Sequence, residues 1–240
     1  MDTFGIIRVT RLRNAAARAR QVPDEEFPGS WDDVDEFTGS WSRSSVDPEK
    51  FLGVFKALRL KEGFGLRAYE FRQGGNGNGV IWAVPVDAPV LEPDECPRLD
   101  KGFLQPPKPP GAVPLMSVIE GDDSPWSYLS ASILGREAAE FGAVWHGSSW
   151  TEARILGKPP WDMASLDASP SEVWEWQDAV PDPWCPTYTE QDATKVIALH
   201  VYTCLEMERI YRATDTYQSG RYECETKVEV LSIGRGGYIH

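Results

Sequence analysis

SPWSYLSASILGREAAEFGAVWHGSSWTEARIL, residues 124–156, contains the clearest helix signal in this 240-residue sequence. Asp123 or Ser124 can cap a helix N-terminus, and Pro125 has no backbone N–H to leave unpaired at the first helical position. Gly142 is a natural stop. Between them, apolar residues recur at helical spacing, namely Leu129, Ala131, Ile133, Leu134, Ala138 and Phe141. This pattern predicts a helix over residues 125–141.

A short apolar run, residues 143–147, follows this helix and predicts a buried strand with His146 near its end. A histidine there could act as a general base, because its ordinary pKa of about 6.5 allows proton exchange near neutral pH. Glu140 and Glu152 are acidic neighbours that could orient the ring. The alternative is a core or rim histidine that hydrogen-bonds to backbone.

The C-terminal third shows the strongest strand pattern. One alternating face carries Ile197, Leu199, Val201, Thr203, Leu205 and Met207, and the other carries His200, Glu206 and Glu208. A second alternation covers residues 222–230, and residues 215–220 are expected to form the turn of a hairpin. A helix over 193–210 is the competing interpretation. In the hairpin, His200 and the glutamates would share the wetter face.

Other segments supply further elements. Residues 4–10 predict a strand, and the alanine- and arginine-rich residues 11–20 favour a helix. Asp47-Pro48 opens another helix that should run towards Gly63, and residues 66–71 and 80–86 should pair across a glycine-rich loop. We therefore predict an α+β fold: an antiparallel sheet built from hairpins, with two or three helices packed on one face.

A proline-rich segment, residues 85–114, contains nine prolines and cannot form a central strand or helix. Its composition indicates a surface connector, or else a polyproline ligand for an aromatic groove. We expect one domain over residues 1–240, with 85–114 as the candidate internal boundary.

The chain is acidic, with 24 Lys and Arg against 37 Asp and Glu and a formal charge of −13. This charge disfavours nucleic acid and anionic membranes and favours a basic protein partner. The four cysteines are far apart, which predicts free thiols and neither a zinc nor a redox site. The sequence has no apolar run of the ~20 residues that span a bilayer, so we expect a cytoplasmic protein.

An acidic segment with aromatic residues lies near the N-terminus, framed by Gly29-Ser30-Trp31 and Gly39-Ser40-Trp41. It suits docking, or pairing with the arginines of residues 8–20. The predicted partner-binding residues are Trp31, Asp32, Asp33, Asp35, Glu36 and Trp41.

Tryptophan is abundant, and six of the ten residues fall in one 40-residue window. The surrounding loop, residues 157–186, is expected to pack over a sheet face or line a cleft. The candidate cleft or interface aromatics are Trp145, Trp150, Trp161, Trp174, Trp176 and Trp184.

Catalytic signatures are missing from the sequence: there is no Walker lysine, nucleophile elbow, zinc-protease motif or dinucleotide fingerprint. No cofactor and no metal site are expected. The leading hypothesis is a protein-binding module, such as an inhibitor, immunity-type or adaptor protein, that holds a basic partner. One alternative is a structural subunit of a larger assembly, which could be a homo-oligomer of this chain. The other is a hydrolase that uses His146 or His200 with a nearby carboxylate.

Overall fold

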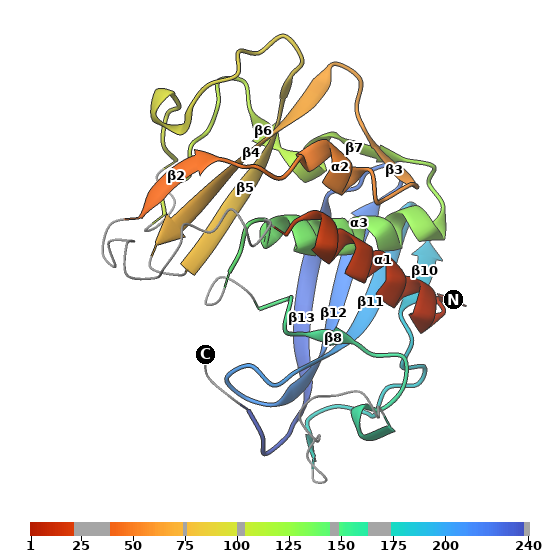
Figure 1. Ribbon diagram of the computed structural model, residues 1–240. Helices are drawn as coiled ribbons and strands as arrows, with labels where there is room; N and C mark the ends of the chain where they lie inside the picture. Colours follow the sequence, from red (N-terminus) through yellow and green to blue (C-terminus); the bar gives the residue numbers. More distant parts are fainter. Residues whose placement is uncertain (22–38, 74–75, 100–103, 145–148, 163–173, 238–240) are drawn as a thin grey trace.

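The computed structural model describes residues 1–21, 39–73, 76–99, 104–144, 149–162 and 174–237 (Figure 1). Its elements form a curled antiparallel sheet with three helices, 22% helix and 39% strand, which confirms the predicted α+β class. In the described residues, no helix is both long and apolar enough to cross a membrane.

The main sheet is antiparallel and its strands follow the order β1-β10-β11-β12-β13-β9, with β8 paired to β11. Their bounds are β1 Asp2–Thr3, β8 Arg154–Ile155, β9 Glu175–Trp176, β10 Thr187–Gln191, β11 Thr194–Thr203, β12 Arg209–Gln218 and β13 Cys224–Ile233. The long strands β11, β12 and β13 pair over most of their length and form the central part of this sheet.

Two smaller sheets lie at the other end of the molecule (Figure 1). One has the order β2 (Ser40–Arg43), β4 (Phe64–Gln73), β5 (Asn76–Pro85) and β6 (Val113–Pro114), and the other pairs β3 (Leu58–Leu60) with β7 (Ile119–Gly121). The β4–β5 hairpin confirms the pairing predicted across the glycine-rich loop.

The central helix, α3 (Pro125–Ala139), contacts both β11 and β5. Ser124 caps it by accepting a hydrogen bond from the Ser127 N–H, as the sequence predicts. Apolar side chains are buried on most sides of α3, because α1 (Ile6–Ala19) packs on it as well. The helix ends at Ala139, and Gly142 adopts φ +65° as the chain reverses.

Gly135 should be replaceable by alanine with a gain in stability. It lies inside α3, and a Cβ built on it meets no atom within 4 Å. Alanine should raise the free energy of unfolding by about 0.5–1 kcal/mol, because it loses less backbone entropy on folding. Urea denaturation measures this change. Gly142→Ala, at a positive φ, should lower stability in the same assay, and equal effects would contradict the prediction.

The strand predicted over residues 4–10 is wrong: α1 begins at Ile6. Val9, Arg13 and Ala16 are buried at helical spacing against the core, whereas Ile7 is 67% exposed. Packing on α3 therefore outweighs the strand preference of the β-branched residues. The predicted helix over 11–20 is confirmed as the continuation of α1.

The helix that begins after Asp47 is shorter than predicted. α2 (Pro48–Leu52) has the expected Asp47 cap but ends at Gly53. The chain then forms β3, and Gly63, at φ +86°, turns it into β4.

The C-terminal hairpin required a larger correction. β11 is a strand, so the helix interpretation is wrong, but β11 ends at Thr203. The predicted pairing of the two alternating segments across a turn at residues 215–220 is also wrong, because residues 209–218 form an additional strand, β12, that lies between β11 and β13. β12 carries the buried polar residue Asp215 on its inward face, which interrupts the apolar alternation that identifies a strand.

The proline-rich segment packs on the small sheet through carbonyl groups. The indole N–H groups of Trp82 and Trp41 donate to the carbonyl oxygens of Pro107 (2.8 Å) and Leu104 (2.9 Å), and the Tyr69 hydroxyl donates to that of Leu91 (3.0 Å). Its role as a domain boundary stays a prediction.

A buried strand was predicted over residues 143–147. Val144 forms an isolated bridge with Gly77, and residues 145–147 lie outside the described ranges.

Candidate functional site

A tryptophan cluster covers the face of the main sheet that points away from α3. Ile197, Leu199 and Val201 of β11 pack towards the core that α3 shares, so the alternation of the strand places His200 and Tyr202 on the other face. Tyr202, Ile210 and Leu231 are buried there beneath tryptophan side chains. The described tryptophans of the loop over residues 157–186 therefore pack over a sheet face, as predicted.

Four tryptophans meet in this cluster. Trp161, from a short 3₁₀ turn (Pro160–Asp162), lies 6.0 Å from Trp184 and 6.3 Å from both Trp174 and Trp176, measured between ring centroids. β9 holds Trp176 in place by pairing with the end of β13, where Trp176 is opposite Ser232. The rings meet mostly edge to face or tilted, an arrangement that aromatic pairs favour.

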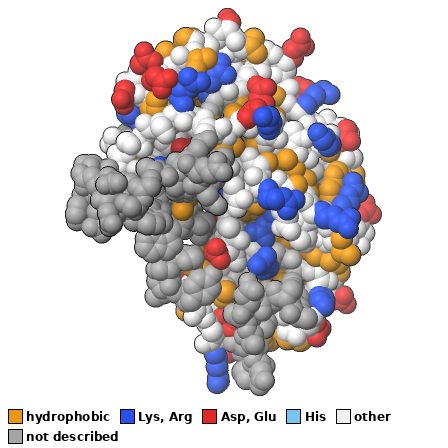
Figure 2. All heavy atoms as spheres, viewed as in Figure 1, with side chains coloured by type: hydrophobic (Ala, Val, Ile, Leu, Met, Phe, Trp, Pro, Cys, Tyr) orange, Lys and Arg blue, Asp and Glu red, His pale blue; other side chains and the backbone are white. Residues whose placement is uncertain are grey.

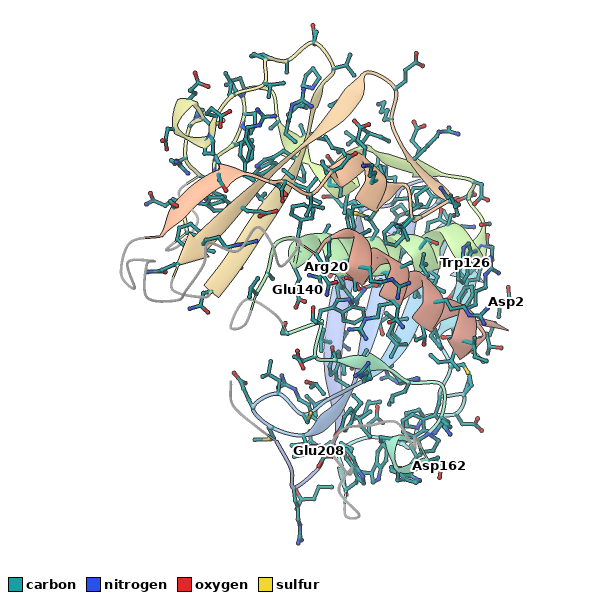
Figure 3. The ribbon with its side chains drawn as sticks, viewed as in Figure 1. Asp2, Arg20, Trp126, Glu140, Asp162 and Glu208 are labelled. Carbon is teal, nitrogen blue, oxygen red and sulfur yellow. The ribbon has the colours of Figure 1, made fainter. Side chains whose placement is uncertain are left out.

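Trp161 is the exposed member of the cluster, with 47% of its surface open to solvent. Four exposed carboxylates lie within two residues, along the sequence, of one of the clustered tryptophans: Asp162, Glu175, Asp178 and Asp182. Figure 3 shows Asp162 beside the clustered rings at one end of the molecule. Arg212 offsets part of this charge through Asp178 (3.4 Å) and Glu229 (3.0 Å). We call Trp161, Trp174, Trp176, Trp184 and these four carboxylates the Trp161 surface.

His200 is buried behind this cluster, not on a solvated face. Its Nδ1 lies 3.2 Å from the carbonyl oxygen of Trp184, and its ring centroid is 6.1 Å from that of Trp184. Burial lowers the pKa of His200, the Trp184 carbonyl opposes this shift, and the charge of Arg212 adds to it. Within the described part of the chain, no carboxylate forms an ion pair with the ring, a contact that the hydrolase hypothesis requires.

The buried His200 should make stability depend on pH. Its folded pKa lies below the ordinary value of about 6.5, so the unfolded chain binds more protons between these two values. Stability is then complete above about pH 6.5 and declines as the pH falls towards the folded pKa. His200→Gln should reduce this slope in urea denaturation between pH 7 and 5. Parallel curves for the two proteins would contradict the prediction.

The other predicted site residues lie apart from the Trp161 surface. Trp41 packs against Phe71 with the two rings tilted and their centroids 5.5 Å apart, and Trp150 is buried and donates from its indole to Glu137 (2.8 Å). Seven candidates lie outside the described residues: the partner-binding candidates Trp31, Asp32, Asp33, Asp35 and Glu36, the aromatic candidate Trp145 and the catalytic candidate His146.

No family model, curated protein or solved structure matches this chain. Its function is therefore inferred from its own residues.

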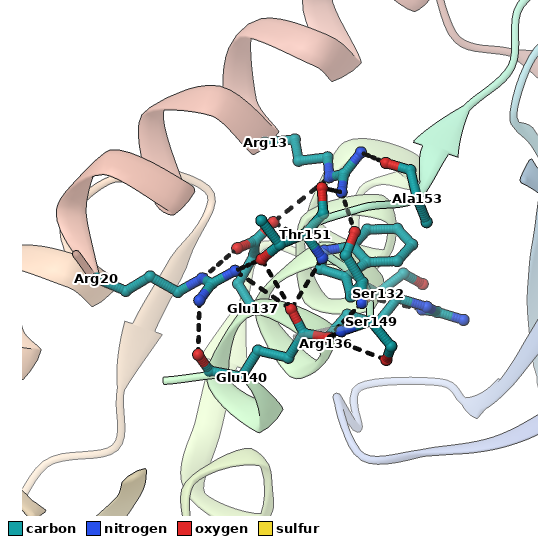
Figure 4. Close-up of polar contacts among 10 residues, drawn as sticks. Arg13, Arg20, Ser132, Arg136, Glu137, Glu140, Ser149, Thr151 and Ala153 are labelled. Carbon is teal, nitrogen blue, oxygen red and sulfur yellow. Dashed lines mark hydrogen bonds and ion pairs between the residues drawn. The ribbon is translucent and has the colours of Figure 1, made fainter. Parts of the chain in front are cut away.

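A buried network of charges joins α1, α3 and residues 149–153 (Figure 4). The Arg20 guanidinium donates to Glu137 (2.7 Å) and to the carbonyl oxygen of Glu140 (2.6 Å). The Glu140 carboxylate in turn accepts from the backbone N–H groups of Ser149, Trp150 and Thr151. These groups satisfy one another, so we assign the network a structural role.

This network is absent from the sequence-based predictions, although the sequence contains a signal for it. Arg13 and Arg20 share the helical face of the buried Ala16, a placement that puts charges in a core and requires acidic partners. Figure 2 shows that other basic side chains gather over α1 on the outside of the molecule, where Arg8, Arg11 and Arg18 are exposed.

Metal ligands and thiols are the remaining candidate groups among the described residues. No group of three or more His, Cys, Asp or Glu side chains there is arranged to hold a metal ion. All four cysteines are free, and Cys96 is buried.

Proposed function

We propose that this chain is a binding protein, of the inhibitor, immunity-type or adaptor kind, that holds a basic protein partner against the Trp161 surface. The observation that supports this most is the half-exposed ring of Trp161, which packs against three other tryptophans in a part of the chain that also carries four exposed carboxylates.

The arrangement fits the energetics of protein interfaces. Tryptophan is enriched among the residues that dominate binding energy, and rigid side chains lose little entropy on binding. Edge contacts with Trp176 and Trp184 hold the Trp161 ring in one orientation before a partner arrives. A lysine or arginine could then stack on its exposed face and pair with a neighbouring carboxylate.

The charge of the whole chain supports the same kind of partner. At −13, the protein attracts basic proteins over a distance and raises their association rate at low salt. The acidic segment around Trp31 stays a prediction, and it could extend the same interface or form a second one.

Trp161→Ala tests this proposal directly. A partner captured from the native extract on immobilised wild-type protein is purified and titrated against both forms by calorimetry. We expect the variant to bind at least about 30-fold more weakly, which corresponds to roughly 2 kcal/mol for a dominant interface residue. Ile7→Ala, at a side chain that is 67% exposed on α1, is the matched control and should bind as wild type does.

Charge is tested separately from aromatic contact. Converting Asp162, Glu175, Asp178 and Asp182 to their amides should slow association and flatten its salt dependence. The control converts four exposed carboxylates elsewhere: Asp2, Glu62, Asp87 and Asp192. Equal effects of the two sets, or unchanged affinity in Trp161→Ala, would refute this surface as the interface. Recovery of the chain only as its own oligomer would favour the structural-subunit alternative.

A further inference from the structure

A cavity of about 610 Å³ opens on the opposite face of the main sheet, between the C-terminal end of α3, residues 149–153 and strands β12 and β13. Its position follows from the lengths of the elements. α3 covers the sheet as far as Arg136, which pairs with Asp215 of β12, and the helix ends at Ala139. β12 extends beyond this point, because six further residues, beginning with Arg209, precede Asp215 in the strand. The uncovered end of the sheet forms the cavity floor.

The cavity floor is apolar. Val228 and Val230 of β13 line it with 59% and 37% of their surfaces exposed, and Leu205 adds a further apolar side chain. Trp150 lines the wall under the end of α3. These side chains give the floor an apolar surface that a ligand with an apolar body could cover.

The polar end of the cavity carries two donors for which the described residues provide no acceptor. Arg209 forms no ion pair, and the Tyr211 hydroxyl no hydrogen bond, with any described residue, although both line the cavity. Arg136 also lines it, but its guanidinium is already occupied by Asp215 at 2.6 and 3.0 Å. Burial raises the pKa of Tyr211 although Arg136, Arg13 and Arg209 oppose the shift, so its hydroxyl stays a donor at neutral pH.

The acidic groups of the cavity leave this end suited to an anion. Glu140 is compensated by Arg20 and by three backbone N–H groups. Glu206 lines the cavity but is exposed, where water and salt screen its charge. The volume falls in the range of sites for small organic molecules, which are mostly apolar with a few polar groups that fix orientation.

We propose that this cavity binds a small organic carboxylate with an apolar body. The carboxylate accepts from the Arg209 guanidinium and the Tyr211 hydroxyl, and the body lies on Val228, Val230 and Leu205. This site is independent of the proposed protein-binding function, because the Trp161 surface lies on the other face of the sheet.

The test uses the full chain and two probe pairs that differ only in charge: 3-phenylpropanoate with 3-phenylpropanamide, and octanoate with octanamide. Calorimetry should show saturable binding of at least one carboxylate, with the amide at least about 10-fold weaker. Arg209→Gln should weaken the carboxylate by about 10- to 100-fold and leave the amide nearly unchanged, because the lost contact is a charge-assisted hydrogen bond.

Three further variants separate the proposal from general effects. Tyr211→Phe should weaken the carboxylate less than Arg209→Gln does, and Val228→Trp should block both members of a pair by filling the exposed floor. Arg221→Gln, at an exposed arginine outside the cavity, and Trp161→Ala should both bind as wild type does. Circular dichroism confirms that each variant is folded.

Three results would contradict the proposed carboxylate site. The proposal is overturned if neither carboxylate binds at millimolar concentration, if amides bind as well as carboxylates, or if Arg209→Gln and Arg221→Gln behave alike. A loss of partner binding in Trp161→Ala with intact carboxylate binding would show that the two sites are separate.

Discussion

Glu140→Ala should lower the free energy of unfolding by about 3–5 kcal/mol, the cost of breaking a buried ion pair from one side. The side chains of Arg20 and Glu140 are only 6% and 7% exposed. Alanine would leave the Arg20 guanidinium short of one carboxylate and would strip the N–H groups of Ser149, Trp150 and Thr151 of their acceptor. Urea denaturation at pH 7 measures the loss.

An exposed ion pair supplies the control for this experiment. Arg59 and Glu120 form a hydrogen-bonded pair at 3.0 Å whose side chains are 74% and 41% exposed. Glu120→Ala should cost less than about 1 kcal/mol, because water replaces the lost contact. Glu140→Gln keeps the shape but removes the charge, and its loss should fall between the two. A loss below 1 kcal/mol for Glu140→Ala would contradict a structural role for the network.

Asp215→Ala should cause a loss of similar size, about 3–5 kcal/mol. The carboxylate is fully buried and accepts two hydrogen bonds from Arg136 and one from Thr226 at 2.7 Å. Burial alone would lower the pKa of Arg136, but its hydrogen bonds to Asp215 and the charge of Asp215 outweigh burial and raise it. Without Asp215, the guanidinium is left charged and unpaired under α3.

A double variant shows whether the loss comes from the orphaned charge. Arg136→Met combined with Asp215→Leu should be more stable than Asp215→Ala alone, because an apolar pair leaves no charge to compensate. Asp178→Ala is the exposed control: its carboxylate is 52% exposed, lies 3.4 Å from Arg212, and should cost less than about 1 kcal/mol. If Asp215→Ala matches Asp178→Ala, Asp215 does not hold α3 on the sheet.

Much of the secondary structure could be read from local sequence. The cap at Ser124, the proline at 125 and the following apolar spacing locate α3, because these signals act within one or two turns of helix. Alternation and a glycine-rich loop likewise identify β4 and β5. Such features need no knowledge of what the element packs against.

Segments that bury polar side chains were not identified by these local patterns. β12 was missed because Asp215 occupies an inward position that the pattern assigns to an apolar residue. That position is stabilised by the charge of Arg136, 79 residues away in sequence. The N-terminal run was misread as a strand because burial of Val9, Arg13 and Ala16 becomes visible only when α3 is in place. Polar burial depends on a distant partner, which a local pattern cannot contain.

By itself, the sequence determined the α+β class, the acidic charge and the concentration of tryptophans over one loop, since all three follow from composition and short-range spacing. Only the tertiary structure decided which tryptophans meet. Trp161 joins Trp174, Trp176 and Trp184 because β9 pairs with β13, while Trp150 faces the other side of the sheet beside Glu137. The same holds for the cavity: the pairing of β12 with β13 brings Arg209, Tyr211 and Val228 together, and the end of α3 at Ala139 leaves them uncovered. Both conditions exist only after the chain has folded.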